Sequence, residues 1–357
     1  MSNSFTESEN MEKNPMVLII YIIAFIVGLP CNLLACYSFL SKVRRKPVPI
    51  DILLLNLTIS DLFLLIFLPF KMAEVALAFT WPLPSLLCPL ANFFFYSSIY
   101  ISTLFLMGVS IERYLCIAYP VKHKLNRRPT YAKIASLFFW FLACSHCGCI
   151  VFIVHYLPGS SWSHTDNVTC YHHFSPEQLV IVLPFRLELF FVLFLLPFLI
   201  TVTCYVNVIR ILNSMPNIKP QKRQRAMGLA VATVLNFTLA FAPYNISHVV
   251  GFVLKKSPSW RTETFCLTSL NTVLDPIIFF FSSSTIRRTF TECWIGICRK
   301  FRNHTSLCCP CCCKSCRDND KKGQTGELSL GNIPSILAGS STPTPFATLE
   351  PSMTLDE

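Results

Sequence analysis

The sequence predicts an all-α membrane protein in which seven transmembrane helices form a bundle, followed by a short amphipathic helix on the cytosolic side. The 357-residue chain is 53% hydrophobic and only 14% charged, whereas a soluble domain carries about a quarter charged residues. Seven apolar stretches are long enough to cross a bilayer, and basic clusters separate them on alternate sides. Because cytosolic loops are rich in lysine and arginine, we expect a multi-pass protein of the cell membrane with its N-terminus outside.

Other classes of protein fit this composition less well. The net charge of +11 does not indicate a nucleic-acid partner, because the basic residues gather between the apolar spans. No metal-ligand or nucleophile motif indicates an enzyme or a bound cofactor. A transporter would show repeated halves with broken, glycine-rich helices, and the chain has no such repeat. We expect no cleavable signal peptide, since the first apolar run is long enough to remain as a span.

The first two spans are expected at about 16–40 and 51–77, after a polar segment, 1–15, that lies outside. Residues 42–46, four of which are basic, mark the cytosolic side between them. The second span places Asp61 in mid-membrane. A lone carboxylate there costs several kcal/mol, which indicates a functional role.

The third span begins at Cys88 and ends near Pro120, after the tripeptide Glu112-Arg113-Tyr114. The 24 residues from Cys88 to Glu112 cover about 36 Å of α-helix, enough to cross a bilayer. By itself, the tripeptide is equally typical of an ion pair at a helix end. Another basic run, 122–128, follows on the cytosolic side.

The fourth span is expected at about 131–157 and the last three at about 179–212, 222–254 and 262–281. The loop after the fourth span lies outside by parity and carries a glycosylation sequon at Asn167. The adjacent Cys170 is therefore on the side where disulfides form.

After the bundle, 16–283, the segment 284–301 has apolar residues at helical spacing with arginines and lysines between them. This pattern is typical of an amphipathic helix that lies on anionic membrane lipids. The tail, 302–357, lacks apolar periodicity and is expected to be disordered. Its serines and threonines are either phosphorylation sites or parts of a linker.

A dense cysteine cluster opens this tail. We interpret these cysteines as acylated at the membrane surface, and zinc binding is the alternative, although no spacing matches a known zinc site. The cluster comprises Cys308, Cys309, Cys311, Cys312, Cys313 and Cys316.

With the spans assigned, the chain resembles the rhodopsin-like G-protein-coupled receptors over about residues 16–300. Glu112-Arg113-Tyr114 resembles the signature that ends their third helix, and each span has a residue at the family's signature position. These residues are Asn32, Asp61, Cys88, Arg113, Trp140, Pro197, Pro243 and Pro276.

Within that family the chain is most similar to the short-chain free fatty acid receptors. The similarity is carried by "PIDILLLNLTISDL", "FYSSIY", "SIERYL", "LPFRLEL", "FAPYNISHVVGF" and "KKSPSWR". The resemblance implies a small carboxylate ligand, a heterotrimeric G protein and arrestin bound through a phosphorylated tail. It also implies a disulfide between Cys88 and Cys170, the cysteine pair that parity places outside.

Three basic side chains, Arg186, His248 and Arg261, are expected in the extracellular third of the bundle. Without an obvious acidic partner they suggest an anion site, because guanidinium groups bind carboxylates through two hydrogen bonds. In the resembled receptors the matching positions hold the ligand's carboxylate. A single arginine here is equally well explained as a membrane-interface anchor.

Aromatic and histidine side chains are expected to complete this pocket. Ordinary packing within the bundle is the alternative for the tyrosines. The candidates are Tyr96, Tyr100, Tyr244, His146 and His155.

The resemblance also assigns activation residues at the cytosolic end. Glu112 restrains Arg113 at rest, and Tyr205 meets Arg113 on activation, with Tyr114 and Asp275-Pro276 in the same machinery.

A mid-bundle sodium site is implied as well. Hard oxygen ligands suit sodium, although the two carboxylates in the set alternatively share a proton. Its residues are Asp61, Ser102, Asn271 and Asp275.

Three features depart from the resembled receptors: the motif of the seventh span, one residue of the sixth span and the loop after Cys170. Asp275 and Phe279 stand where asparagine and tyrosine are usual, and Phe241 replaces tryptophan; both changes also occur in the fatty acid subgroup. An acidic residue usually follows Cys-Tyr in short-chain members, but here the stretch is 171–174, Tyr-His-His-Phe.

Two alternative ligand classes remain open. A receptor for longer or hydroxylated carboxylates fits the same basic residues. A proton-sensing receptor fits the many histidines in the outer half, because histidine titrates near neutral pH.

Overall fold

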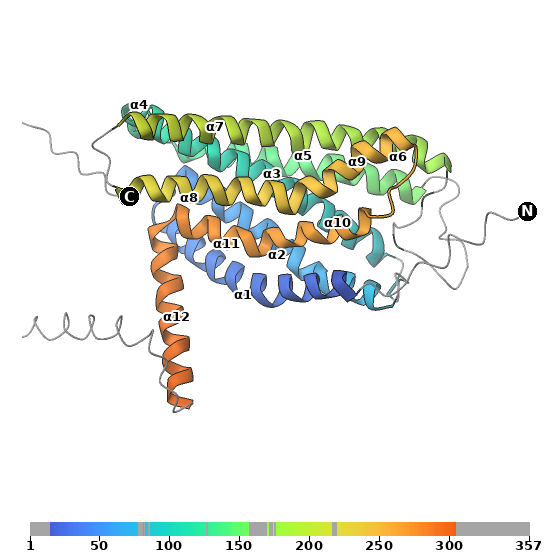
Figure 1. The fold of residues 1–357 in the computed structure, drawn as a ribbon, viewed down its shortest axis with the longest axis horizontal. Coiled ribbons are helices and arrows are strands. Elements are labelled where there is room, and N and C mark those ends of the chain that lie inside the picture. Colours follow the sequence, from blue (N-terminus) through green and yellow to red (C-terminus); the bar gives the residue numbers. More distant parts are fainter. Residues whose placement is uncertain are drawn as a thin grey trace, which may run out of the picture. The chain divides into compact units, whose positions relative to one another are not determined.

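The computed structural model describes residues 15–77, 81, 83–84, 86–125, 128–156, 170, 174, 176–215 and 220–304. Throughout these residues the regular secondary structure is helical, without a strand. Seven helical segments in this part of the chain are long and apolar enough to cross a membrane, and Figure 1 shows them as a bundle. The predicted fold class is therefore confirmed.

The seven spans agree with the predicted ones to within a few residues. The first four are α1 (Pro15–Arg45), α2 (Pro49–Ala76), α3 (Leu87–Ala118) and α5 (Pro129–Tyr156). The fifth combines α6 (Pro176–Leu189), a π-helical turn (Phe190–Leu195) and α7 (Leu196–Ser214). The sixth combines α8 (Pro220–Asn236), a π-helical turn (Phe237–Phe241) and α9 (Ala242–Leu254). The seventh combines α10 (Arg261–Leu267), a 3₁₀ turn (Thr268–Leu270) and α11 (Asn271–Ser282).

The third span differs from the prediction at its end. Helix α3 stops at Ala118 rather than continuing to Pro120, and Pro120 instead begins a short helix, α4 (Pro120–Leu125). Proline disfavours helical geometry in the residue before it, and Tyr119 has φ −131° and ψ 58°. Proline is well tolerated as the first residue of the next helix.

Two prolines inside spans leave carbonyl groups without their usual helical donor, and side chains from neighbouring helices supply it. Pro197 has no N–H for the carbonyl of Leu193, which accepts the hydroxyl of Thr103 on α3 at 2.7 Å. Pro276 likewise cannot bond the carbonyl of Thr272, and Asn32 on α1 donates to that oxygen at 2.8 Å. These bonds fasten α3 to the fifth span and α1 to the seventh.

Helix α3 is the most deeply buried of the seven spans. It packs against α2, α5 and α7, and its small residues (serine, threonine and glycine) allow close approach. One end of the bundle contains the start of α3, the start of α6 and the end of α9 (Figure 1). We call it the disulfide end, because Cys88 on α3 is bonded to Cys170 there. The predicted Cys88–Cys170 disulfide is thus confirmed.

Helix α12 (Ser284–His304) covers the predicted amphipathic segment and extends three residues beyond it. Trp294 on this helix is exposed. The chain from Arg288 onward forms a unit separate from the bundle by its contacts.

Candidate functional site

The structure brings Arg261, Tyr244 and His248 together at the disulfide end of the bundle. The guanidinium of Arg261, in the first turn of α10, donates to the hydroxyl of Tyr244 on α9 at 2.9 Å. Its central carbon lies 5.3 Å from the centre of that tyrosine ring. The ring of His248, one turn further along α9, is 4.6 Å from that of Tyr244. The four-residue spacing of Tyr244 and His248 places both on one face of the helix.

Tyr100 on α3 joins this group through His248. Its hydroxyl lies 3.0 Å from Nε2 of His248, and both side chains are buried. The other ring nitrogen of His248, Nδ1, is buried without a partner in the described part of the chain. A buried ring nitrogen without a hydrogen bond is costly, so this atom is a natural contact for a ligand.

Arg186 on α6 completes the set of basic residues. It is only 4% exposed, donates to Ser257 at 3.0 Å and lies 4.7 Å from the ring centre of Phe174. The Arg186 and Arg261 guanidinium groups repel each other electrostatically. No carboxylate among the described residues is paired with either arginine. Two like charges, one of them buried, are expensive without a paired acid in the described part of the chain, and an anion bound between them would offset that cost.

Aromatic rings surround the cluster. Phe265 on α10 lies 5.2 Å from Tyr244 and 5.3 Å from Tyr96, measured between ring centres. The predicted tyrosines Tyr96, Tyr100 and Tyr244 therefore lie in one region. Aromatic rings therefore lie beside Arg261 and His248.

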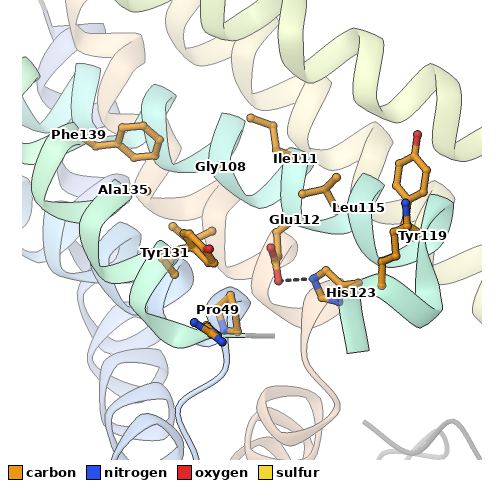
Figure 2. Close-up of a pocket in the computed structure, with 14 residues that line it drawn as sticks. Pro49, Gly108, Ile111, Glu112, Leu115, Tyr119, His123, Tyr131, Ala135 and Phe139 are labelled. Carbon is orange, nitrogen blue, oxygen red and sulfur yellow. Dashed lines mark hydrogen bonds and ion pairs between the residues drawn. The ribbon is translucent and has the colours of Figure 1, made fainter. Parts of the chain in front are cut away.

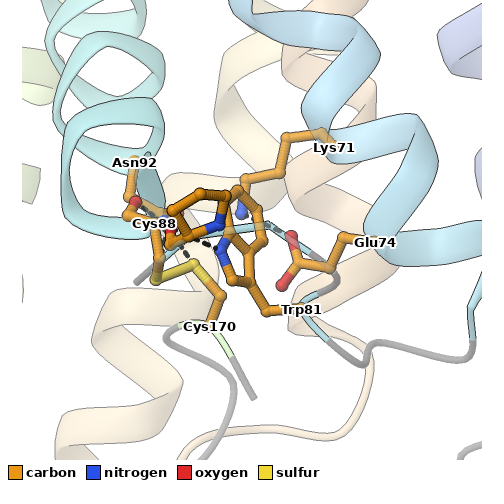
Figure 3. The surroundings of a disulfide bond; sticks show 7 residues. Lys71, Glu74, Trp81, Cys88, Asn92 and Cys170 are labelled. Atoms are coloured by element: carbon orange, nitrogen blue, oxygen red, sulfur yellow. Dashed lines mark hydrogen bonds and ion pairs between the residues drawn. A yellow bond between two sulfur atoms is a disulfide. The ribbon is translucent and has the colours of Figure 1, made fainter. Parts of the chain in front are cut away.

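A buried ion pair on α2, which the sequence analysis did not single out, lies next to these rings. The ammonium of Lys71 is 2.9 Å from Oε2 of Glu74, and both residues are buried. The same ammonium is 5.9 Å from the ring centre of Phe265. Figure 3 shows the pair beside Trp81 and the disulfide. The sequence does signal this pair, because two opposite charges stand three residues apart inside an otherwise apolar span.

Of the two predicted histidines of the fourth span, His146 is bonded outside the cluster. His146 on α5 places Nε2 2.8 Å from Oε1 of Glu188, and Nδ1 2.8 Å from the carbonyl of Leu142. Both nitrogens face acceptors, so His146 has no spare donor for a ligand in this structure. Glu188, two residues beyond Arg186 on α6, is the partner that the sequence analysis missed. His155 lies in the last turn of α5, and its side chain is outside the described residues.

The opposite end of the bundle holds the Glu112-Arg113-Tyr114 tripeptide. Arg113 donates to the carbonyl of Ser282 at 2.5 Å, whereas Oε1 of Glu112 lies 2.8 Å from Nε2 of His123 (Figure 2). The predicted Glu112–Arg113 restraint is therefore not the pairing in this structure. The reason is α4, a helix that the sequence analysis did not expect, which brings His123 to the glutamate.

The other activation residues have local partners. The hydroxyl of Tyr205 on α7 is 3.2 Å from that of Thr233 on α8, so it does not bond Arg113 here. The ring of Tyr114 packs edge-on against that of Tyr119, 6.3 Å between centres.

The four residues of the predicted sodium site are buried in the middle of the bundle. Asn271 donates to Asp61 at 3.1 Å and lies 3.4 Å from the hydroxyl of Ser102. Asp275 accepts from Asn236 at 2.6 Å. Asp61, Asn271 and Asp275 each retain one side-chain oxygen without a partner among the described residues. Such oxygen donors fit a hard cation, and they equally fit a proton shared between the two carboxyl groups.

Several predicted sites lie outside the described residues. They are the sequon at Asn167, the loop residues 171–173, the cysteine cluster 308–316 and the C-terminal tail.

Comparison with known proteins agrees with this geometry. The model of the rhodopsin family of seven-transmembrane receptors matches residues 31–279. The chain is 50% identical over 280 residues to free fatty acid receptor 2 of Homo sapiens, covering 78% of this chain and 84% of that protein. It is 47% identical over 273 residues to free fatty acid receptor 3 of Mus musculus, covering 76% and 85%. Free fatty acid receptor 1 of Macaca fascicularis is more distant, at 31% identity over 271 residues.

Proposed function

The chain belongs to the rhodopsin family of seven-transmembrane receptors, and we propose that its ligand is a short-chain carboxylic acid. Membership makes it a multi-pass membrane receptor that acts through a G protein. The family consists of receptors rather than enzymes. The names of the relatives point to fatty acids as the ligand class, and the geometry at the disulfide end supports a carboxylate.

The observation that carries this proposal is the cluster formed by the buried Arg186 and His248 with the partly buried Arg261. It has two positive charges without a paired acid among the described residues, and a buried ring nitrogen without a partner. A carboxylate neutralises one charge and accepts two parallel hydrogen bonds from a guanidinium group. Tyr244 already orients Arg261 through a 2.9 Å hydrogen bond.

The aromatic walls favour a small acid. Acetate has four heavy atoms, and at about 1.5 kcal/mol per atom it gains at most ~6 kcal/mol. That limit corresponds to a Kd of roughly 40 µM, so we expect high micromolar to millimolar potency. Each added methylene contributes about 0.8 kcal/mol while the pocket has room. We expect the rings of Tyr96, Tyr100 and Phe265 to limit the ligand to a chain of a few carbons.

A panel of straight-chain acids from two to twelve carbons, at fixed pH, tests the proposal through G-protein activation. Potency should rise from acetate to propionate or butyrate and fall by about six carbons. Potency that keeps rising through eight and twelve carbons would identify a receptor for longer acids. A response to acidification on the side of the disulfide end alone, without any carboxylic acid, would instead favour proton sensing.

We further propose that the disulfide end is extracellular and that the opposite end contacts the G protein. The last turn of α1, at the opposite end, carries Lys42, Arg44 and Arg45, and basic residues favour the cytosolic side. Accessibility of tags placed before Pro15 and after His304 in intact cells tests this orientation. A tag before Pro15 that is labelled only after permeabilisation contradicts it.

The same orientation leads us to propose that α12 lies on the inner membrane surface and that the cysteines after it are acylated. Arrestin is then the expected partner of a phosphorylated tail. Mass spectrometry of the purified receptor should detect the acyl groups, and bound zinc instead of acyl groups contradicts this assignment.

For the mid-bundle oxygens we propose a sodium ion held by Asp61, Ser102, Asn271 and Asp275. The supporting feature is the set of unpartnered oxygens on Asp61, Asn271 and Asp275. Agonist potency should then fall as sodium replaces potassium at constant ionic strength. Equal potency in both salts would favour the shared proton.

A further inference from the structure

The acidic residue before Arg113 is bound by a histidine from the neighbouring loop helix. Oε1 of Glu112 lies 2.8 Å from Nε2 of His123, and the side chains are 17% and 14% exposed. His123 lies on α4 (Pro120–Leu125), and its backbone N–H donates to the carbonyl of Tyr119 at 2.9 Å. The contact therefore joins α4 to the end of α3 (Figure 2).

Arg113 is bonded elsewhere in the same structure. Its guanidinium donates to the carbonyl of Ser282 at the end of α11, and its Nε is buried without a partner among the described residues. The Glu112 carboxylate also acts electrostatically on the Arg113 guanidinium, so the glutamate is near both groups. His123 and Arg113 are thus alternative partners for one carboxylate.

The surroundings show which group can change this balance near neutral pH. Glu112 and His123 line a cavity of about 470 Å³ between α2, α3, α4 and α5. Helix α2 contributes only the apolar Pro49 and Leu53, and the remaining charged lining residues are Lys122 and Arg128. Tyr119 and Tyr131 are the lining tyrosines. Lysine, arginine and tyrosine do not titrate near pH 7. Among the described lining residues, only histidine is of a type that does.

Arg113 has its own electrostatic neighbours. Besides Glu112, the Asp51 carboxylate attracts it, but Asp51 is held by Lys42 at 3.1 Å. Tyr205 also acts on Arg113 and carries no charge at neutral pH. Glu112 is accordingly the carboxylate whose partner can switch.

We propose that His123 is a positioning residue that holds Glu112 away from Arg113, and that gaining a proton lets it hold Glu112 more firmly. A neutral imidazole offers Glu112 one hydrogen bond, whereas imidazolium offers a charge-assisted bond of about twice the strength. Mild acidification on this side of the membrane therefore favours the state in which Arg113 is released. This inference rests on the proposed coupling to a G protein, and it predicts higher basal coupling at lower pH.

The test uses the full-length receptor in lipid nanodiscs with a G-protein heterotrimer and no added acid. Basal nucleotide exchange is measured between about pH 6 and pH 8, the range in which histidine changes charge. In the unmodified receptor, exchange should increase as the pH falls. His123→Ala should lower basal exchange about two- to fivefold, the size of a partly exposed ion pair. It should also remove the pH dependence of basal exchange. The G protein alone, measured as a control, should show no such dependence.

Two further variants and a control separate positioning from folding. His123→Arg keeps a permanent cation and should give high exchange at every pH, even if the alanine variant folds poorly. Glu112→Gln should also lose the pH dependence. Lys122→Ala, at the neighbouring exposed lysine, should keep it. A pH dependence that persists unchanged in both His123→Ala and His123→Arg contradicts the inference.

The same experiment distinguishes this inference from the proposed ligand. Adding propionate tests the pocket at the disulfide end, whereas the pH dependence without ligand tests His123. A receptor that does not respond to propionate but has a basal exchange rate that depends on His123 contradicts the proposed ligand and supports the role of His123. A receptor that responds to propionate but has the same basal exchange in all variants supports the proposed ligand and contradicts the role of His123.

Discussion

At the scale of single residues, Arg186 and Arg261 differ from ordinary basic side chains because no carboxylate among the described residues is paired with either of them. Arg186 is anchored by Ser257 and by the ring of Phe174, and Arg261 is anchored by Tyr244. Both guanidinium planes are therefore fixed before a ligand arrives. Such preorganisation reduces the entropy that binding must offset, which matters most for a ligand as small as acetate.

Arg261→Lys should lose most of the response to propionate. A lysine ammonium is a point charge that cannot form two parallel bonds to a carboxylate or keep the contact with Tyr244. Removing one member of a desolvated charge pair costs about 2–5 kcal/mol, which is at least about a 30-fold loss of potency. Concentration–response curves in cells with matched surface expression measure it. Lys256→Ala, an exposed basic residue at the same end, is the control and should respond normally. Full potency in Arg261→Lys contradicts the two-bond geometry.

At the scale of helices, prolines make the spans depend on one another. Pro197 and Pro276 each leave a carbonyl without a donor, and Thr103 and Asn32 from other helices replace it. These polar contacts lie inside an apolar bundle, where an unsatisfied carbonyl is expensive. Prolines that would weaken single helices thereby contribute specific links between them.

Thr103→Val should destabilise the receptor by about 1–3 kcal/mol, because the Leu193 carbonyl would be buried without a donor. The substitution keeps the shape of the side chain, because it replaces only the hydroxyl by a methyl group. Thermal unfolding of the detergent-solubilised receptor should show a lower midpoint. Thr203→Val is the matched control, since the exposed Thr203 bonds a carbonyl of its own helix, that of Leu199. Equal midpoints for the two variants would show that the Thr103 bond contributes no more than an ordinary exposed one.

Gly28→Ala should disturb the packing of α1 on α11. A Cβ at position 28 would lie 2.7 Å from Oγ1 of Thr272, the residue whose carbonyl Asn32 bonds. Overpacking of this kind typically costs about 1–3 kcal/mol. Surface expression and thermal midpoint should both fall. Gly296→Ala on α12, whose added Cβ would meet no atom of the described residues within 4 Å, should leave both unchanged. An unaffected Gly28→Ala receptor would mean that Thr272 moves aside without cost.

At the scale of the whole molecule, the disulfide lies in an apolar cluster that reaches Arg186 through Phe174. Cys170 packs in an apolar cluster with Cys88, Trp81 and Val182, and Phe174 packs against this cluster. Phe174 in turn lies against the guanidinium of Arg186. The covalent link therefore fixes Cys170 in the cluster that contacts Phe174, which lies against Arg186.

Cys170→Ala should lower both surface expression and potency for propionate. The bond closes a separation of 82 residues, for which the chain-entropy model gives about 4–5 kcal/mol of stabilisation. Cell-surface labelling and concentration–response curves measure the two effects. Cys149→Ala, a substitution of an exposed free cysteine, is the control. Normal expression and potency in Cys170→Ala would exclude this role.

The sequence by itself determined the seven spans, because apolar length and basic flanks follow directly from the cost of placing polar groups in lipid. It also supplied the disulfide pair and the residues of the anion cluster, since the motifs around Arg186, His248 and Arg261 resemble a known family. Residue spacing along one helix placed Tyr244 and His248 on a common face.

Only the tertiary structure decided which side chains pair between helices. Glu112 bonds His123 because Pro120 starts a new helix that turns the loop back toward α3, and His146 bonds Glu188 because α5 meets α6 there. The Lys71–Glu74 pair on α2 lies near Tyr96 and Tyr244 because Phe265 on α10 contacts both the Lys71 ammonium and these two rings. Such pairings depend on the rotation and crossing of whole helices, which local periodicity does not fix, and a shift of one residue along a helix turns a side chain by about 100°.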